Sequence, residues 1–486
     1  MSEAMDLKSE KIPHDDPMTL GWIAWALDGQ LASANLPPEA AAKRWRAVET
    51  DSRAPMADAV FVALKGERFD GRDFAAKAAQ AGAAALVLER PIDAEAAGAA
   101  VQLVVSDARL AYGAIAKAWR ARHSLPLTAV GGSNGKTTTT QMLAAVLRAR
   151  WGAERMLATE GNFNNEVGVP RTLLRLRFEH RAAVVEAGMN HKGEMARLAD
   201  WIRPTIVLLT NAQREHQEFL SSVEETAREN GLLIPALPES GIAVYPADDP
   251  CAPVWAALAL SRGVRSLTFA MGLAAAGLAA DLHGEALSDG ALRIRGAVFG
   301  RPVDFAMKLA IPGAHNARNA LAAAAAALAQ DISPEAIREG LEAFRALPGR
   351  GARWRSATGV TVIDDAYNAN PDSCEASIRM LALERGRKIL LLGDMAEIGA
   401  DATERHREAG MLAKAAGIDV LWTAGPLAAH AAEGFGEGAR AFATREALLA
   451  ALAELEVPAG AAIDVKASHS AGFAAVVEAL KRRLGA

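Results

Sequence analysis

Cysteine is nearly absent from this sequence. Cys251 and Cys374 are the only two in 486 residues, and they lie far apart, without the close spacing that metal ligands show. These features argue against a disulfide framework and against a zinc site, and they suit a protein of a reducing cytoplasm.

The sequence also lacks an excess of positive charge and a long apolar run. Its formal net charge is -5 and its pI is near 6.1, so general attraction to nucleic acid or to an anionic membrane is not expected. The longest uncharged apolar run, residues 320–329, is too short to cross a bilayer, and residues 1–17 are charged and contain no apolar core. We therefore expect a cytoplasmic protein that is neither exported nor inserted in a membrane.

What the sequence does contain is a regular alternation of short apolar runs, rich in leucine or β-branched residues, with alanine-rich helical segments. This alternation is typical of parallel sheets covered by helices, so we predict an α/β fold. A chain of this length needs more than one hydrophobic core. We place three domains at residues 1–106, 107–346 and 347–486, with the second join at Pro348-Gly349.

The strands that the pattern predicts fall into one group per domain. They cover residues 60–64, 84–88 and 102–105 in the first domain, 127–130, 183–186 and 205–210 in the second, and 360–363, 388–392, 418–423 and 461–465 in the third. Asp107 is expected to cap a helix that runs to about residue 122. Because ligands collect at the carboxyl edge of parallel strands, we expect the nucleotide in the second domain.

A glycine-rich segment follows the predicted strand 127–130 and precedes a helix with an apolar face. Its glycines let backbone N–H groups approach phosphate oxygens, its lysine reaches the outer phosphates, and its threonine hydroxyl can bind magnesium. Val130 replaces the first glycine of the longer motif, so the match is to the shorter Gly-x-x-Gly-Lys-Thr form. We predict that ATP contacts Gly132, Ser133, Asn134, Gly135, Lys136, Thr137 and Thr138; a glycine-rich turn with a solvated lysine is the weaker interpretation.

Two oxygen donors near the predicted sheet edge suit a magnesium ion. Glu186 ends the strand 183–186, and Thr137 lies in the glycine-rich segment, so together with ATP phosphates and water they would complete a first shell. His216, just beyond the strand 205–210, is either a further ligand or an exposed or structural histidine.

The last third of the chain offers further polar candidates, each with two interpretations. Asn316 and Asn319 lie one helical turn apart and can read an adenine edge or cap the helix. Asp365 can hold ribose hydroxyls or form a turn before a capped helix start at residues 372–375. Arg350 can meet a transferring phosphate or stay solvated.

Taken together, these stretches resemble the Mur ligase family from about residue 50 to residue 468. The stretches that carry the resemblance are Thr50-Asp51-Ser52-Arg53, Phe61 to Gly71, Gly161-Asn162-Phe163-Asn164-Asn165, Glu186-Ala187-Gly188-Met189-Asn190-His191, Asp364-Asp365-Ala366-Tyr367-Asn368-Ala369-Asn370 and Gly393-Asp394-Met395-Ala396-Glu397. They are most similar to the branch of the family that adds D-alanyl-D-alanine to UDP-N-acetylmuramoyl-tripeptide in peptidoglycan synthesis.

The resemblance implies an N-terminal UDP-substrate domain, a central ATPase domain and a C-terminal Rossmann-like domain. It implies a monomeric ligase that uses ATP and two Mg²⁺ ions to form an acyl phosphate, which the amine of D-alanyl-D-alanine then displaces. The implied catalytic residues are Lys136, Glu186, His216 and Arg350, with Thr137, Glu186 and His216 on magnesium and Asn316, Asn319, Arg350 and Asp365 on ATP. The implied substrate contacts are Ser52, Arg53, Lys65, Gly66, Asn162, Asn164, Asn165, Tyr367, Asn368 and Asn370.

The sequence departs from the family pattern at two places. Lys466-Ala467-Ser468-His469 stands where the branch usually shows Lys-Gly-Ser-Arg, and Asn230 stands where Mur ligases commonly carry a carbamylated lysine. No lysine occurs between Lys192 and Lys308, so we expect no carbamylated lysine. The second magnesium would then depend on His216, the acyl phosphate and water, with the amide oxygen of Asn230 or the nearby Glu229 as neutral or charged alternatives.

Two other functions fit part of the sequence. A folylpolyglutamate-synthetase-like ligase would share the phosphate chemistry, but the motif at residues 50–71 favours a UDP-linked substrate. A nucleotide-binding paralogue without turnover is disfavoured by the presence of Lys136, Thr137 and Glu186.

Overall fold

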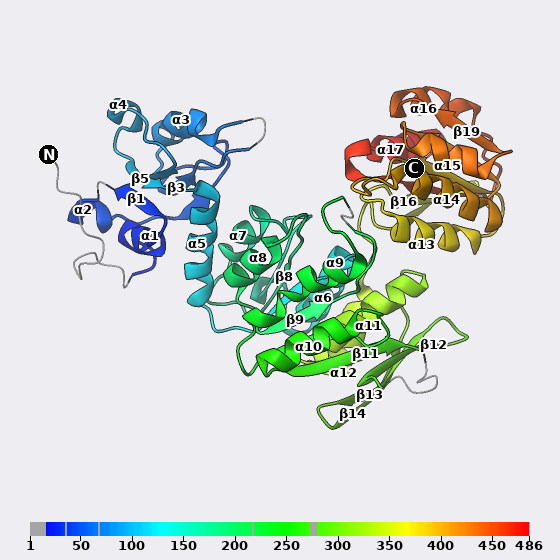
Figure 1. Cartoon of the computed structure of the whole chain (residues 1–486), viewed down its shortest axis with the longest axis horizontal. Coiled ribbons are helices and arrows are strands. Elements are labelled where there is room, and N and C mark those ends of the chain that lie inside the picture. The colour runs from blue at the N-terminus through cyan, green and yellow to red at the C-terminus, as the bar shows by residue number, and fades with distance from the viewer. Residues whose placement is uncertain (1–15, 35, 67–68, 216–217, 273–278, 486) are drawn as a thin grey trace. The chain divides into compact units, whose positions relative to one another are not determined.

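The computed structural model of the chain describes residues 16–34, 36–66, 69–215, 218–272 and 279–485 (Figure 1). Its internal contacts divide the chain into two compact units. Unit 1 comprises residues 1–127, 157–187 and 197–203, and unit 2 comprises residues 128–156, 188–196 and 204–486. Both units combine sheets with helices, which confirms the predicted α/β class.

Unit 1 contains a five-stranded sheet with the order β1-β5-β4-β3-β2. Its strands are β1 (Leu31–Ala34), β2 (Ala47–Glu49), β3 (Ala59–Val62), β4 (Ala85–Leu88) and β5 (Val101–Val105). The three predicted strands of this region are confirmed as β3, β4 and β5. The strands β2 to β5 pair in parallel, and β1 joins β5 antiparallel at the edge.

Apolar side chains from the helices of unit 1 build its core. The helices are α1 (Leu20–Ala26), α2 (Pro38–Ala41), α3 (Ala75–Gln80), α4 (Ala94–Ala97) and α5 (Ala108–Ala121), with a 3-10 turn η1 (Gly71–Phe74). Trp22, Trp45 and Trp119 pack ring against ring with centroids 5.7–6.2 Å apart. The predicted cap of α5 is confirmed, because Asp107 Oδ1 accepts hydrogen bonds from the backbone N–H groups of residues 109 and 110.

Unit 1 also includes the segment that carries Glu186. It consists of β7 (Met156–Ala158), α7 (Gly168–Leu173) and β8 (Ala182–Glu186), followed by residues 197–202 of α8 (Glu194–Ile202). Every residue of β8 is buried, as its continuous apolar run requires. The predicted strand 183–186 is therefore confirmed.

Unit 2 begins with seven neighbouring strands in the order β14-β13-β12-β11-β10-β9-β6. Their bounds are β6 (Leu127–Gly131), β9 (Ile206–Leu209), β10 (Ile242–Pro246), β11 (Arg265–Met271), β12 (Leu282–Ala286), β13 (Leu292–Val298) and β14 (Arg301–Met307). β6 and β9 confirm two predicted strands. Pairing is parallel from β6 to β12, but β12, β13 and β14 are antiparallel.

The antiparallel edge differs from the parallel sheet that the sequence pattern predicted. Phe299 and Gly300 alone connect β13 to β14, and both have positive φ angles, of 48° and 83°. A two-residue turn of this kind matches the twist of a hairpin and cannot connect parallel neighbours. The helices of this part are α6 (Lys136–Trp151), α9 (Val223–Gly231), α10 (Ala252–Arg262), α11 (Ala314–Leu328) and α12 (Pro334–Ala343), with 3-10 turns η2 (Ala153–Arg155) and η3 (Ile234–Ala236).

The C-terminal part of unit 2 has its own six-stranded sheet with the order β15-β16-β20-β17-β18-β19. Its strands are β15 (Ala352–Arg355), β16 (Thr361–Asp365), β17 (Lys388–Gly393), β18 (Val420–Ala424), β19 (Ala439–Phe442) and β20 (Ala462–Lys466). The four strands predicted here are confirmed as β16, β17, β18 and β20. Only β15 is antiparallel to its neighbour.

Helices cover both faces of the C-terminal sheet (Figure 1). They are α13 (Pro371–Ala382), α14 (Ala402–Ala415), α15 (Ala428–Phe435), α16 (Arg445–Ala451) and α17 (Ala474–Leu484), with 3-10 turns η4 (Leu452–Glu454) and η5 (His469–Ala471). Successive residues of β17 belong to different cores: Ile389 and Leu391 pack with α16 and α17, whereas Leu390 and Leu392 pack with α13, α14 and α15. This alternation fixes the strand register.

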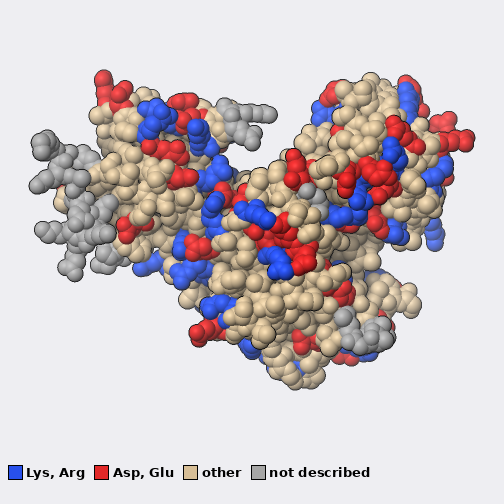
Figure 2. All heavy atoms as spheres, in the orientation of Figure 1, with Lys and Arg blue, Asp and Glu red and all other residues tan. Residues whose placement is uncertain are grey.

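Figure 2 shows basic and acidic side chains side by side on the face drawn, in line with the small net charge. Among the helices of the described residues, none is both long and apolar enough to span a membrane.

Candidate active site

The glycine-rich segment forms a tight loop between β6 and α6, both in unit 2. Gly132 and Gly135 have φ angles of 116° and 81°, which side-chain-bearing residues rarely adopt. A Cβ atom at Gly132 would collide with the Thr210 hydroxyl, and one at Gly135 with the Asn319 amide. Lys136, Thr137 and Thr138 form the first turn of α6. The strand, loop and helix that the motif requires are therefore present.

Polar groups that follow β9 hold this loop in place. The Asn211 side chain forms two hydrogen bonds with the backbone of Asn134, accepting from its N–H at 2.9 Å and donating to its carbonyl at 3.0 Å. Thr210 Oγ1 donates to the same carbonyl at 2.8 Å, and Ser133 N–H donates to the Asn211 carbonyl at 3.0 Å. Hydrogen bonds from neighbouring protein groups thus fix the shape of the loop.

Lys136 lies inside the loop and not in solvent. Its Nζ donates to the carbonyl oxygens of Gly132 and Ser133 at 2.7 and 2.8 Å, and it forms an ion pair with Glu215 Oε1 at 2.7 Å. The side chains of Lys136 and Glu215 are only 12% and 9% exposed. The ion pair and the two carbonyl bonds hold the ammonium group at the loop.

Asn230, the residue at the position of the missing lysine, supports the same loop. Its Oδ1 accepts a hydrogen bond from Gly132 N–H at 3.1 Å, and its Nδ2 donates to the Thr226 carbonyl at 3.1 Å. The sequence suggested that this oxygen, or else Glu229, would face a metal ion. In the structure the Asn230 oxygen accepts from the backbone of the glycine-rich loop between β6 and α6, which is called the phosphate loop below. Glu229 accepts hydrogen bonds from the backbone N–H groups of Gly193 and Met195.

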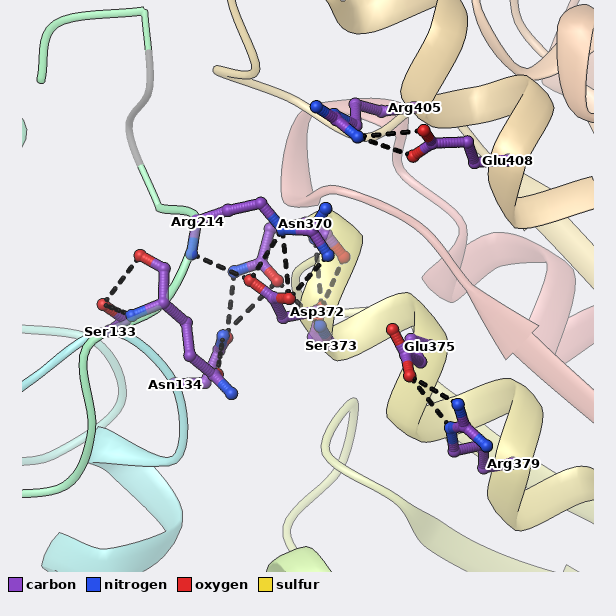
Figure 3. A network of polar contacts seen from close by, with 11 residues as sticks. Ser133, Asn134, Arg214, Asn370, Asp372, Ser373, Glu375, Arg379, Arg405 and Glu408 are labelled. Carbon is purple, nitrogen blue, oxygen red and sulfur yellow. Dashed lines mark hydrogen bonds and ion pairs between the residues drawn. The ribbon is translucent and has the colours of Figure 1, made fainter. Parts of the chain in front are cut away.

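The phosphate loop also contacts the start of α13, as Figure 3 shows. The side-chain amides of Asn134 and Asn370 face each other, with Asn370 Nδ2 donating to Asn134 Oδ1 at 2.9 Å and Asn134 Nδ2 lying 3.4 Å from Asn370 Oδ1. Asn134 Nδ2 donates a shorter bond, of 2.7 Å, to Gln213 Oε1. The glycine-rich loop is thereby joined to the C-terminal sheet domain.

A second contact lies beside it. Arg214 holds Asp372 through its backbone N–H at 2.8 Å, its Nε at 3.1 Å and its Nη2 at 2.7 Å (Figure 3). The Asp372 side chain raises the pKa of the Arg214 guanidinium, as an ion pair does. The predicted helix start needs correction here: α13 begins at Pro371 and Asn370 is its cap, because its side chain and that of Ser373 form a capping box.

The two asparagines of α11 differ in their surroundings. Asn319 is 8% exposed, and its amide lies where a side chain at Gly135 would be, so it lines the phosphate loop. Asn316 donates through Nδ2 to the Pro312 carbonyl at 2.7 Å, a local bond at the helix start. The structure thus brings Asn319 to the loop. Asn316 does not cap the helix, because Gly313 is the N-cap of α11 and no side chain accepts from the first N–H groups there.

Three segments of the sequence match domains of one known enzyme family. Residues 45–120 match the catalytic domain of the Mur ligase family, residues 130–327 the Mur ligase middle domain, and residues 349–469 the glutamate ligase domain of Mur ligases. The UDP-N-acetylmuramoyl-tripeptide–D-alanyl-D-alanine ligase of Escherichia coli K12 is 38% identical over 482 residues, covering 96% of this chain and 98% of that protein. The chain belongs to the Mur ligase family.

Further relatives of this Mur ligase agree with the assignment. The enzyme of the same name from Synechocystis is 36% identical over 440 residues, covering 89% of this chain and 91% of that protein. A crystal structure of MurF from Acinetobacter baumannii superposes with a TM-score of 0.81 at 30% identity and covers 96% of this chain and 98% of that one. The three-domain Mur ligase architecture therefore applies here.

In this Mur ligase Glu186 lies in unit 1, as the last residue of β8. It is 1% exposed, its Oε1 accepts a hydrogen bond from Asn164 Nδ2 at 2.7 Å, and its backbone N–H donates to Thr159 Oγ1 at 2.9 Å. Two side chains predicted for different roles, Glu186 and Asn164, are therefore in contact. Asn162 and Asn165 are exposed, and Asn165 uses its Oδ1 to accept from the N–H groups of residues 167 and 168. His216 lies outside the described residues.

Two predicted residues of the C-terminal part, Arg350 and Tyr367, lie beside His469, which the family pattern does not predict. The Arg350 guanidinium lies 4.1 Å from the Tyr367 ring centroid, and the ring of His469 lies 5.2 Å from the same ring. His469 is the residue that replaces the usual arginine. The Asp365 carboxylate lies 2.7 Å from Lys466 Nζ, and the Asn368 carbonyl accepts from the same Nζ at 2.8 Å.

The predicted UDP-substrate residues are grouped at turns of unit 1. Arg53 forms an exposed, two-pronged ion pair with Asp51, with bonds of 2.9 and 2.7 Å, and this hydrogen bonding lowers the pKa of Asp51 to about 2. Ser52 lies between them. Lys65 and Gly66 are exposed, and the Lys65 carbonyl accepts from Arg109 at 3.3 Å. Asp51 therefore orients the exposed Arg53 guanidinium.

Replacing Arg53 with alanine is expected to weaken binding of UDP-N-acetylmuramoyl-tripeptide about tenfold, the usual effect of losing one charge-assisted hydrogen bond. Ser52→Ala should act in the same direction with a smaller effect. Calorimetry would measure the dissociation constants for the UDP-substrate and for ATP. Arg46→Ala is the matched control, because Arg46 also forms an exposed ion pair in unit 1, with Asp58 at 3.6 Å. An Arg53→Ala enzyme with weakened ATP binding and unchanged UDP-substrate binding contradicts the assignment.

Sequence reasoning missed the residues that support the phosphate loop. Glu215 was passed over although it precedes His216, and the neighbouring Gln213 and Arg214 contact Asn134 and Asp372. The available signal was the dense run of polar residues from Asn211 to Glu218 directly after a buried strand. Such runs at the carboxyl end of a central parallel strand are typical of functional loops.

Proposed function

We propose that this chain is the ATP-dependent ligase that joins D-alanyl-D-alanine to UDP-N-acetylmuramoyl-tripeptide, giving UDP-N-acetylmuramoyl-pentapeptide, ADP and phosphate in peptidoglycan synthesis. The observation that carries the proposal is the glycine-rich loop with its buried Lys136. It occurs in a chain that matches UDP-N-acetylmuramoyl-tripeptide–D-alanyl-D-alanine ligases along nearly its whole length.

The chemistry requires activation of the tripeptide carboxylate, because a carboxylate cannot expel oxide. We propose that its oxygen attacks the γ-phosphorus of ATP, that ADP leaves, and that the amine of D-alanyl-D-alanine attacks the acyl carbon and expels phosphate. Lys136 at the loop and Arg350 supply positive charge where two anions meet. In this account Asn211, Thr210 and Asn230 contribute indirectly, because they hold the loop backbone in the shape that accepts the phosphates.

Magnesium fits the oxygen donors that the chain offers. Thr137 presents a hydroxyl in the first turn of α6, and Glu186 presents a carboxylate at the end of β8. Within the described residues, no three His, Cys, Asp or Glu side chains are close enough to hold a metal ion by themselves. That donor set suits Mg²⁺, which keeps waters and takes ligands from substrate phosphates. We propose that Thr137, Glu186 and His216 contribute to two Mg²⁺ ions, which would neutralise charge on the phosphates.

We further propose that the enzyme works without a carbamylated lysine. Asn230 has no amine that could react with carbon dioxide, and its side chain is committed to Gly132 and Thr226. Turnover in degassed buffer should therefore equal turnover after bicarbonate is added at constant pH. Sodium chloride at the same ionic strength is the control. A large and reversible rise in turnover that bicarbonate alone produces contradicts this proposal.

One chain holds the phosphate loop and the C-terminal residues that touch it, Asn370 and Asp372, so we propose that the enzyme acts as a monomer. We place it in the cytoplasm, where ATP and UDP-linked precursors are available. The three-domain boundaries at residues 106 and 346 also remain our proposal.

The function is tested by phosphate release with ATP, UDP-N-acetylmuramoyl-tripeptide and one of three acceptors. D-alanyl-D-alanine should support rapid release, and glutamate and free D-alanine should not. Equal release with glutamate would favour a folylpolyglutamate-synthetase-like activity. Absence of release with all three acceptors, from a folded protein that binds ATP, would favour the nucleotide-binding paralogue without turnover.

A further inference from the structure

Lys466 is a lysine with almost no contact to solvent. It is the last residue of β20, and its side chain is 3% exposed. A buried ammonium is expensive unless its charge and its hydrogen bonds are satisfied. Its Nζ lies 2.7 Å from Asp365 Oδ2 and donates to the Asn368 carbonyl at 2.8 Å.

The sheet register explains why these groups meet. β16 and β20 are parallel neighbours, and Asp365 is directly opposite Lys466 at the carboxyl end of both strands. Ligands of open α/β sheets bind at that edge. A lysine at any earlier position of β20 would not lie opposite the acid that ends β16.

A second buried acid, Asp464, shares the Ser377 hydroxyl with Asp365. Asp464, two residues earlier on β20, is 1% exposed, and burial raises its pKa to about 7. The Ser377 hydroxyl lies within hydrogen-bonding distance of both carboxylates, at 3.3 Å from Asp365 Oδ2 and closer to Asp464 Oδ2. The hydroxyl has a single hydrogen, so Ser377 donates to one of the two carboxylates at a time.

These contacts use only one of the two Asp365 oxygens. Oδ2 is held by Lys466 and Ser377, and among the described residues no hydrogen bond reaches Oδ1. The carboxylate is 25% exposed, although its partner Lys466 is buried. One oxygen is thus fixed by the protein and the other is left for hydroxyl groups of a ligand.

The same ammonium also fixes the loop that follows Asp365. Its bond to the Asn368 carbonyl holds the middle of residues 366–370, and that loop ends at Asn370, which caps α13 and contacts Asn134 of the phosphate loop. One side chain therefore orients the predicted ribose acid and the backbone that reaches the phosphate loop.

We propose that Lys466 is a positioning residue of the nucleotide site: it orients Asp365 toward the ATP ribose and holds the loop 366–370 in its binding shape. The inference rests on the proposed function for the assignment of Asp365 to ribose. Lys466 itself touches no substrate in this account and acts through Asp365 and Asn368.

The test is a double-mutant cycle of Lys466→Met and Asp365→Asn, with binding of a non-hydrolysable ATP analogue and of UDP-N-acetylmuramoyl-tripeptide measured by calorimetry. Each single change should weaken the ATP analogue about tenfold, the usual effect of one charged hydrogen bond, and leave the UDP-substrate unchanged. In the Asp365→Asn background, Lys466→Met should have a smaller effect than in the unaltered enzyme, because only its bond to the Asn368 carbonyl is then left to lose. Lys481→Met is the control, since Lys481 forms an exposed ion pair with Glu478 in the same sheet domain.

The outcomes separate the two proposals. A folded Lys466→Met enzyme with unchanged affinity for the analogue overturns the inference, as do full additivity of the two changes and an Asp365→Asn enzyme that binds the analogue normally. If the single Lys466 variant does not fold, the double variant, in which neither position is charged, is compared with Asp365→Asn. A further loss of affinity of about tenfold or more overturns the inference, because the two changes would then be additive. Absence of ligation by the unaltered enzyme would instead overturn the proposed function, and analogue binding would still test Lys466.

Discussion

Replacing Lys136 with alanine is expected to lower ATP turnover by about 10³-fold or more, because the ammonium stabilises charge that develops on the transferring phosphoryl group. Binding of the UDP-substrate should remain, since its predicted contacts near Arg53 lie in unit 1 and the phosphate loop lies in unit 2. Phosphate release and calorimetry with the UDP-substrate measure the two effects separately.

Because Lys136 and Glu215 form a buried ion pair, the control for Lys136→Ala is a double variant in which both charges are removed. Removing the lysine alone takes away the ion-pair partner of the buried Glu215, and breaking a buried pair in this way destabilises proteins by about 3–5 kcal/mol. The Lys136→Met/Glu215→Gln enzyme removes both charges, so it should regain thermal stability without regaining turnover. Near-normal turnover of that double variant would show that Lys136 is structural. Loss of UDP-substrate binding in a folded Lys136 variant would contradict the division of roles between the domains.

Glu186→Gln is expected to lower turnover by about 10²-fold or more and to raise the magnesium concentration needed for half-maximal rate. Glutamine keeps an oxygen that can accept from Asn164 Nδ2, so the 2.7 Å hydrogen bond survives and the fold should persist. What is lost is the negative charge that a metal ligand supplies. Turnover measured across a magnesium titration gives both quantities.

A matched change is available at Glu160, which forms an exposed ion pair with Arg175 at 2.6 Å in the same unit. Glu160→Gln should leave the magnesium titration unchanged. If Glu186→Gln also turns over normally at limiting magnesium, Glu186 has only a structural role.

The phosphate loop could be predicted from the sequence because its constraints are local. Each of its features is encoded by residues close together in the sequence: glycines at the positive φ angles of Gly132 and Gly135, an apolar run for the strand before them, and an apolar helix face after Lys136. The same is true of the Asp107 cap and of the central strands, whose apolar runs are short and bounded by polar turns. The hairpin of β13 and β14 also had a local signal in Phe299-Gly300, which the search for parallel strands passed over.

The supports of the site could not be predicted, because they join residues distant in sequence. Glu215 meets Lys136 across 79 positions, and Asn230 meets Gly132 across 98. Such pairs depend on which strands are neighbours and on the rotation of α9, and a one-residue change of register would separate them. For the same reason the sequence left the Asn230 amide oxygen as an alternative metal ligand, whereas it accepts a hydrogen bond from the loop backbone at Gly132.

The most direct test of the central claim follows oxygen from the tripeptide to phosphate. Both oxygens of the terminal carboxylate of UDP-N-acetylmuramoyl-tripeptide are labelled with ¹⁸O. The labelled substrate is incubated with ATP, magnesium and D-alanyl-D-alanine, and the ¹⁸O content of the products is measured by mass spectrometry. We expect UDP-N-acetylmuramoyl-pentapeptide that retains one ¹⁸O in the new amide, together with an equal amount of phosphate that carries the other. Failure to form the pentapeptide, or its formation with unlabelled phosphate, would contradict the account.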